Sequence, residues 1–162
     1  MKTVYLDNSA TTPLCPEAVA AMQEAMTCFG NPSSLHGVGQ AAHTLVEKAR
    51  REVSAALGLR GTKPGELIFT GSGTEASVTA IWGTVYAKAR RSARRILTTN
   101  CEHPSVEQTL SRLEADGFEV ARITTKNGVL NMEQYQKELN NRVFLVTMMM
   151  VNNETGALYD LK

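Results

Sequence analysis

The stretch "FTGSGTEASVTA", residues 69–80, joins a short apolar run to a segment whose apolar residues recur at helical spacing. Two glycines, a serine and a threonine stand where a strand would lead into a helix. Glycines let the backbone approach a ligand closely, and the free N–H groups at a helix start attract an anion. The turn therefore predicts a phosphate-binding cradle that uses Gly73 and Thr74. A tight turn followed by a simple helix cap would have the same composition.

Strand-like and helix-like segments alternate on the C-terminal side of this turn. We expect strands at residues 66–70, 95–99, 118–123 and 142–150, helices at 74–93, 104–116 and 132–139, and a turn at 126–128. Before the turn, helices are expected from Pro16 onward and over residues 39–57. This alternation predicts an α/β fold, with a mostly parallel sheet flanked by helices.

The composition narrows the classes of protein that fit. A chain of 162 residues with 43% hydrophobic composition can bury a core of its own. A net charge of +1 gives no field that would favour nucleic acid. No apolar run is long enough to span a membrane, and the N-terminus lacks the apolar core of a signal peptide. The three cysteines are widely spaced, which predicts a reducing cytoplasm and neither a disulfide framework nor a metal site.

Polar groups follow the expected strands, where ligands of open α/β sheets bind. In "CEHP" (101–104), His103 lies at a helix start and could stack on a flat cofactor or move a proton. It could equally be a helix-start histidine bonded to the backbone. In "VNNETG" (151–156), Asn153 could donate to a ring oxygen of a ligand, or it could simply form an Asx turn.

A nucleotide-binding domain is an alternative reading of the glycine-containing turn. The absence of Gly-Lys-Ser/Thr excludes a P-loop. However, "GSGTEA" (71–76) fits a variant of the dinucleotide fingerprint, with Glu102 as the acidic residue after the next strand. That scheme gives His103 and the 151–156 turn no role.

Five blocks taken together carry a resemblance to a known family. They are "YLDNSATTP" (5–13), "FGNPSSLHGVG" (29–39), "IFTGSGTEAS" (68–77), "CEHPSV" (101–106) and "VNNETG" (151–156). In this order the chain resembles the N-terminal half of a cysteine desulfurase, in the class-V branch of the fold-type I enzymes that use pyridoxal 5′-phosphate (PLP). Two departures are a glycine for the usual alanine in "TGSGTEA" and Met150 where a histidine is common.

The resemblance implies a role for particular residues. Gly73 and Thr74 would bind the cofactor phosphate, and Asn153 would bond the 3-hydroxyl oxygen of the ring. His103 would stack on the pyridine ring and help to shuttle protons, which makes it the catalytic residue of this chain. The resemblance also places a further set on the substrate side: Asn8, Ala10, Thr11 and residues 31–36.

The resemblance also implies what the whole enzyme does. Residues 1–15 would form an N-terminal arm and residues 16–162 the N-terminal part of the PLP-binding large domain. The lysine that binds PLP and the cysteine that receives sulfur lie beyond residue 162 in the family, so we expect this chain to be inactive alone. The whole enzyme would be a cytoplasmic homodimer that converts L-cysteine to L-alanine. Its persulfide sulfur would pass to acceptors such as an iron–sulfur scaffold, for cluster or thio-cofactor synthesis.

Other readings of the same resemblance remain open. A selenocysteine lyase or another class-V aminotransferase would share these five blocks. A split or truncated relative could also serve as a non-catalytic binding or assembly module.

Overall fold

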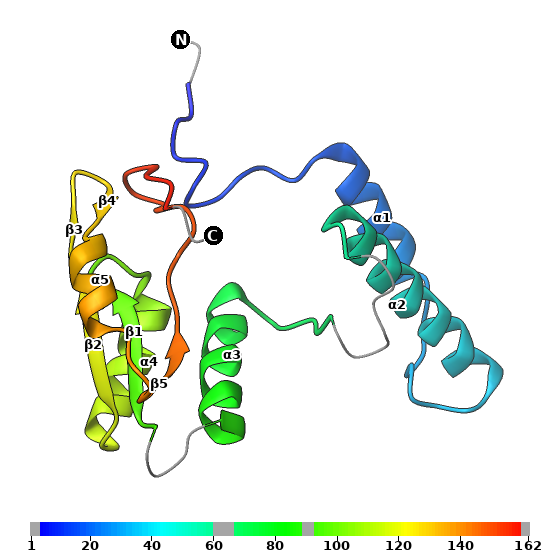
Figure 1. Ribbon diagram of the computed structural model, residues 1–162. Helices are drawn as coiled ribbons and strands as arrows, with labels where there is room; N and C mark the ends of the chain where they lie inside the picture. Colours follow the sequence, from blue (N-terminus) through cyan, green and yellow to red (C-terminus); the bar gives the residue numbers. More distant parts are fainter. Residues whose placement is uncertain (1–3, 60–66, 89–92, 160–162) are drawn as a thin grey trace. The chain divides into compact units, whose positions relative to one another are not determined.

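A computed structural model describes residues 4–59, 67–88 and 93–159 (Figure 1). The chain divides into two compact units, residues 1–69 and 70–162. Within the described residues, no helix is long and apolar enough to cross a membrane. The predicted boundary between an N-terminal arm and a large domain at residues 15 and 16 stays a prediction.

The first unit contains the helices α1 (Pro16–Met26) and α2 (Gly37–Ala56). Pro16 opens α1, because a proline at the first position loses no helical hydrogen bond. His36 caps α2, since its Nδ1 accepts a hydrogen bond from the backbone N–H of Gly39 at 3.3 Å. A Cβ at Gly39 would lie 2.5 Å from the carbonyl oxygen of Ser34, so this position requires glycine.

The second unit carries the sheet. Its elements are α3 (Gly73–Lys88), β1 (Arg95–Thr99), α4 (Pro104–Ala115), β2 (Glu119–Ile123), β3 (Thr125–Lys126), β4 (Val129–Leu130), α5 (Met132–Glu138) and β5 (Val143–Val146). The strand order is β2-β1-β5, and the central strand β1 runs parallel to both neighbours. The short strands β3 and β4 form an antiparallel hairpin. The predicted α/β class with a parallel sheet is therefore confirmed.

An apolar core joins α3 and α4 to the sheet. Its buried members are Ile81 and Val85 of α3, Ile96 of β1, and Leu110 and Leu113 of α4. Each such side chain contributes about 1.5–3 kcal/mol by leaving water. Figure 1 shows α4 behind the sheet and α5 in front of it. Because α3 and α4 share this core, their first turns are held in fixed places.

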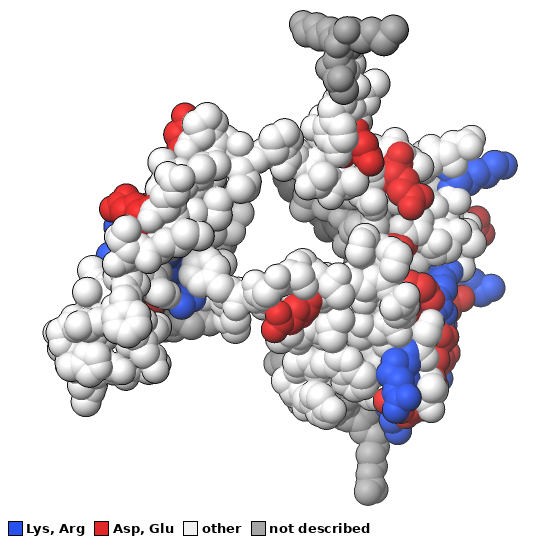
Figure 2. Space-filling view, turned by 180° about the vertical axis from the view of Figure 1, so that it is seen from behind, with Lys and Arg blue, Asp and Glu red and all other residues white. Residues whose placement is uncertain are grey.

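The outer surface of the second unit mixes charges of both signs. Figure 2 shows basic and acidic side chains side by side over this unit. Arg122 of β2 bonds two glutamates of α4, at 2.7 Å to Glu107 Oε1 and 2.8 Å to Glu114 Oε2. These hydrogen bonds raise the pKa of Arg122 and lower the pKa of Glu114. The network ties the outer face of α4 to an edge strand of the sheet.

Two predicted strands differ from the structure. Residues 67–70 form no strand, and Ile68 and Phe69 are exposed; Glu66 lies outside the described residues. The guanidinium of Arg50 bonds the carbonyl of Leu67 and lies 5.1 Å from the centre of the Phe69 ring. No described strand pairs with this segment, and the carbonyl of Leu67 is bonded by Arg50 instead.

The strand predicted at 142–150 is also shorter than expected, because β5 covers only Val143–Val146. The N–H of Thr147 still bonds the carbonyl of Leu97 at 2.9 Å. The N–H of Met149, however, donates to the Glu102 side chain at 3.1 Å. At Met149, the Glu102 carboxylate thus accepts the backbone hydrogen bond that a neighbouring strand would accept in a longer β5. The helix predicted at 74–93 begins one residue earlier and is described to Lys88; residues 89–92 lie outside the described residues.

Candidate functional site

The start of α3 presents open hydrogen-bond donors. Ser72 Oγ accepts from the N–H of Glu75 at 3.1 Å, and the Glu75 carboxylate accepts from the N–H of Gly71 at 2.7 Å. The N–H groups of Gly73 and Thr74 donate to no atom of the described residues. A Cβ built at Gly73 would meet nothing within 4 Å. Two backbone donors at the positive end of the helix are therefore open to a ligand.

The start of α4 is capped by His103. Its Nδ1 lies 3.1 Å from the backbone N of Ser105 and 2.8 Å from Ser105 Oγ. Because a backbone N–H can only donate, Nδ1 must accept, and in the neutral ring the proton is on Nε2. The rest of the ring is exposed. The backbone-bonded reading of His103 is thus confirmed, and it leaves the ring face and Nε2 available.

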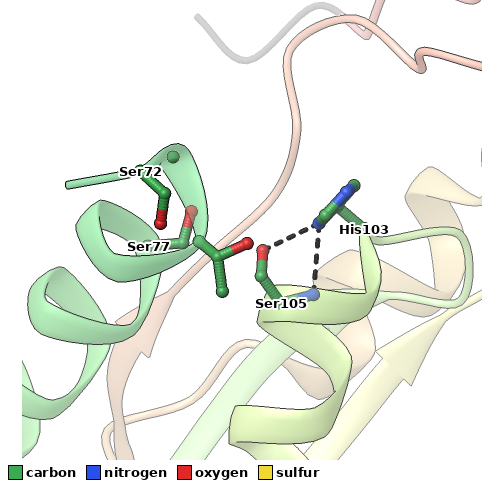
Figure 3. A pocket seen from close by; sticks show the side chains of 6 residues that line it. Ser72, Ser77, His103 and Ser105 are labelled. Atoms are coloured by element: carbon green, nitrogen blue, oxygen red, sulfur yellow. Dashed lines mark hydrogen bonds between the residues drawn. The ribbon is translucent and has the colours of Figure 1, made fainter. Parts of the chain in front are cut away.

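One pocket brings the two helix starts together. It has a volume of about 400 Å³ and is lined by Ser72, Gly73, Thr74, Ser77, His103 and Ser105. Figure 3 shows Ser72 and Ser77, at the start of α3, facing Ser105 and His103, at the start of α4, across this space. The volume falls in the range of small-molecule sites. Hydroxyl groups, open N–H groups and an imidazole therefore face the same space.

Asn153 follows β5 and is exposed. It does not line the pocket, and its side chain forms no hydrogen bond with the described residues. The Asx turn considered for Asn153 is made by its neighbour instead. Asn152 is 5% exposed, and its Oδ1 accepts from the N–H groups of Glu154 and Thr155 at 3.0 and 2.8 Å.

The predicted substrate-side residues Asn8, Ala10 and Thr11 lie in the first unit and are exposed. They form a turn in which the N–H groups of Ala10 and Thr11 donate to the carbonyl of Asp7 at 3.2 and 3.5 Å. The Tyr5 hydroxyl bonds the carbonyl oxygens of Asp7 and Thr11 at 2.8 and 3.1 Å. This turn is ordered locally, and its role toward a substrate stays a prediction.

Sequence reasoning missed several residues of the site. Ser72 could have been found, because "SGTE" has the spacing of a capping box, with a serine three residues before a glutamate. Ser77 lies three residues after Thr74 and shares its helix face. Asn152 carried no signal, since its role depends on a contact with Cys101, 51 residues away in the sequence. In the described parts of the chain, no three His, Cys, Asp or Glu side chains gather as a metal site would require.

Comparison with known proteins identifies the family. The model of the aminotransferase class-V family matches residues 4–162. The chain belongs to this family. It is 43% identical over 165 aligned residues to a cysteine desulfurase of Cereibacter sphaeroides, covering the whole of this chain and 42% of that protein.

Solved structures agree with this assignment. A NifS-like protein superposes with a TM-score of 0.86 at 33% identity, over 96% of this chain and 42% of that protein. A structure of SspA in complex with cysteine gives the same TM-score at 30% identity, over 97% of this chain and 45% of SspA. The resemblance to cysteine desulfurases is therefore confirmed. The chain spans about two fifths of the length of the curated relatives it matches, in their N-terminal part.

Proposed function

We propose that this chain supplies the phosphate- and ring-binding part of a PLP site in a cysteine desulfurase. The pocket between the starts of α3 and α4 is the observation that carries the proposal. PLP is the cofactor that this family generally uses. When bound, it serves as an electron sink for the amino acid substrate.

The pocket residues suit the phosphate of PLP. A phosphate dianion favours the positive end of a helix and N–H donors that no other group uses. Gly73 and Thr74 offer such donors, and the open space over Gly73 lets the anion approach the backbone. Thr74 and Ser77 add hydroxyl groups to the lining. These residues would hold the phosphate. The Glu75 carboxylate accepts a hydrogen bond from the N–H of Gly71 and does not line the pocket.

His103 would contact the cofactor ring and hold a proton at one stated atom. The exposed imidazole can stack on a flat ring, since its Nδ1 is already engaged with Ser105. In the neutral ring Nε2 carries the proton, so His103 would donate from Nε2. Asn153, whose amide is free among the described residues, would donate to the ring 3-hydroxyl oxygen.

For the whole enzyme we propose that L-cysteine is converted to L-alanine, with persulfide sulfur passed to an acceptor such as an iron–sulfur scaffold. The relatives named cysteine desulfurase and the cysteine bound to SspA support this substrate. A cytoplasmic homodimer belongs to the same proposal. Alanine release from L-cysteine by the native protein that carries this chain tests the reaction. Faster turnover of L-selenocysteine would favour a selenocysteine lyase.

Binding of a PLP analogue tests the site in this chain. We would titrate the chain with 4-deoxypyridoxine 5′-phosphate, which lacks the aldehyde that reacts with lysines, and measure the heat of binding. The same compound without its phosphate should bind much more weakly. Thr74→Val should weaken binding of the phosphate compound by about tenfold or more, because a hydrogen bond to a charged group is lost.

A matched control lies on the same helix. Thr84 Oγ1 donates to the carbonyl of Ala80 at 2.8 Å, and Thr84 is remote from the start of α3 in sequence. Thr84→Val should therefore leave the affinity unchanged. Equal affinity with and without the phosphate would rule out the proposed phosphate site. Tight binding of NAD in place of the analogue would favour the dinucleotide reading.

A further inference from the structure

The loop that carries Asn153 is a closed hairpin, drawn in red in Figure 1. Val151 pairs with Leu158 in an antiparallel bridge, and the N–H of Asn152 donates to the carbonyl of Ala157 at 2.9 Å. The N–H of Gly156 returns to the carbonyl of Asn152 at 2.8 Å. Asn152 thus lies at the base of this loop and takes part in both of the latter bonds.

The buried side chain of Asn152 holds the turn around Asn153. Its Oδ1 accepts from the N–H of Glu154 at 3.0 Å, and from the N–H and hydroxyl of Thr155 at 2.8 and 3.0 Å. Asn153 lies between Asn152 and Glu154, whose N–H donates to the Asn152 side chain. The direction in which Asn153 leaves the turn therefore depends on Asn152.

The other half of the same amide reaches the loop after β1. Asn152 Nδ2 donates to the carbonyl oxygen of Cys101 at 3.2 Å and lies 3.3 Å from Met149 Sδ. Cys101 stands two residues before His103 in that loop. One side chain therefore links the backbone that carries His103 to the turn that carries Asn153.

Two further contacts strengthen this link without replacing it. The Glu102 carboxylate accepts from the N–H of Met149 at 3.1 Å. The Tyr159 hydroxyl lies 3.2 Å from Cys101 Sγ. Both join the loop after β1 to the segment after β5, and neither contacts the turn at Asn153 itself. The side-chain amide of Asn152 thus bonds both the loop after β1 and the turn at Asn153.

We propose that Asn152 is a positioning residue, which fixes the place of Asn153 relative to His103 and so sets the spacing of two groups that hold the cofactor ring. The proposal rests on the proposed function of Asn153 and His103. A ring bound by stacking at one loop and by a hydrogen bond at the other needs this spacing held within a fraction of an ångström.

The test uses Asn152→Asp in the whole chain. Aspartate keeps the oxygen that accepts from the turn, and it replaces the Nδ2 donor by an oxygen that faces the carbonyl of Cys101. The matched control is Asn140→Asp, before β5. Asn140 also accepts from a backbone N–H, that of Arg142 at 3.0 Å, and donates to a carbonyl, that of Glu138 at 3.0 Å.

The first measurement needs no ligand. In ¹⁵N–¹H NMR spectra, Asn152→Asp should shift the amide signals of Glu102 and His103, and Asn140→Asp should leave them in place. Unmoved signals in Asn152→Asp would overturn the proposal. If this variant does not fold, Asn152→Ser is the second variant, because serine also forms turns of this kind but is too short to replace the bond to Cys101.

The second measurement compares 4-deoxypyridoxine 5′-phosphate with the same compound lacking the 3-hydroxyl. The wild-type chain should prefer the hydroxyl compound. Asn153→Ala and Asn152→Asp should each reduce that preference by about tenfold, and the double variant should reduce it no further. A loss in Asn153→Ala without a loss in Asn152→Asp would overturn the positioning role alone. No loss in Asn153→Ala would overturn the proposed function of Asn153, and the positioning role with it.

Discussion

The two ends of strand β1 are built from different chemistry. At its amino end, the guanidinium of Arg95 bonds the carboxylates of Glu119 and Glu138. Arg142 adds a further bond to Glu119 at 3.0 Å. At its carboxyl end, hydroxyl, thiol and amide groups join residues 99–103 to residues 149–159. Charges meet at one end, and mostly neutral groups meet at the other.

This difference shows how one strand can serve stability and binding separately. At the amino end, the carboxylates of Glu119 and Glu138 are engaged in ion pairs with arginines. Neutral hydrogen bonds at the carboxyl end fix two loops, and His103, at the end of the first loop, lines the pocket. Preorganised neutral dipoles can accept the charge of a cofactor without competing ion pairs. The two ends should therefore respond differently to mutation, salt and pH.

The largest effect is expected from a mutation in the apolar core, which supports both ends of β1. Leu110 of α4 is fully buried in the core under β1, and Leu110→Ala should destabilise the chain by about 2–5 kcal/mol through lost burial and a cavity. Urea unfolding followed by circular dichroism measures this change. The variant should weaken ligand binding only as far as the folded fraction falls. An unfolding midpoint equal to that of the wild type would show that this core does not support the sheet.

A smaller effect is expected at the amino end. The Arg95 side chain is only 14% exposed, and Arg95→Met should cost about 1–3 kcal/mol, because the Glu138 carboxylate loses its ion pair and Glu119 keeps only Arg142. The wild-type chain should lose part of this difference in concentrated salt, which screens the pairs. Affinity for 4-deoxypyridoxine 5′-phosphate should stay unchanged. A loss of affinity equal to that of Thr74→Val would contradict the separation of the two ends.

The smallest effect is expected at the carboxyl end in alkaline solution. The hydrogen bond with Cys101, together with burial, raises the pKa of Tyr159. The unfolded state then ionises first, so this contribution is complete below pH about 10 and is lost as pH rises through the raised pKa. Tyr159→Phe should lower stability at neutral pH by about 1 kcal/mol and remove this alkaline loss. Unfolding curves of the wild type and Tyr159→Phe from pH 8 to 11 measure both changes in stability. Parallel pH profiles of the two proteins would show that Tyr159 does not cause the alkaline loss.

Local patterns predicted the elements that local physics decides. Strand 95–99 matches β1, and α4 begins at the predicted Pro104, since a buried apolar run and a proline after a capping residue are readable without the fold. The Asn127–Gly128 turn was also predicted, and both residues have positive φ, 51° and 76°. In these cases the residue type and the backbone conformation are directly linked.

Distant contacts explain what the sequence did not predict. The run at 66–70 is apolar enough for a strand, yet in its described part Arg50 binds the backbone in place of a second strand. The run at 142–150 ends in three methionines, yet the N–H of Met149 donates to the Glu102 carboxylate and not to a strand. Within "VNNETG" the two asparagines look alike, and only burial assigns the turn to Asn152. The residues behind each difference are far apart in sequence.

The ties between the two loops also set an order of events for folding. The bond from Asn152 to Cys101 spans 51 residues, and the bond from Tyr159 to Cys101 spans 58. Contacts of this range close large loops and form slowly compared with a helix. During synthesis, the residues of α3, β1, α4 and β2 are made before Asn152. We therefore expect the start of α3 and His103 to form as local structure first, and the loop that carries Asn153 to join them afterwards.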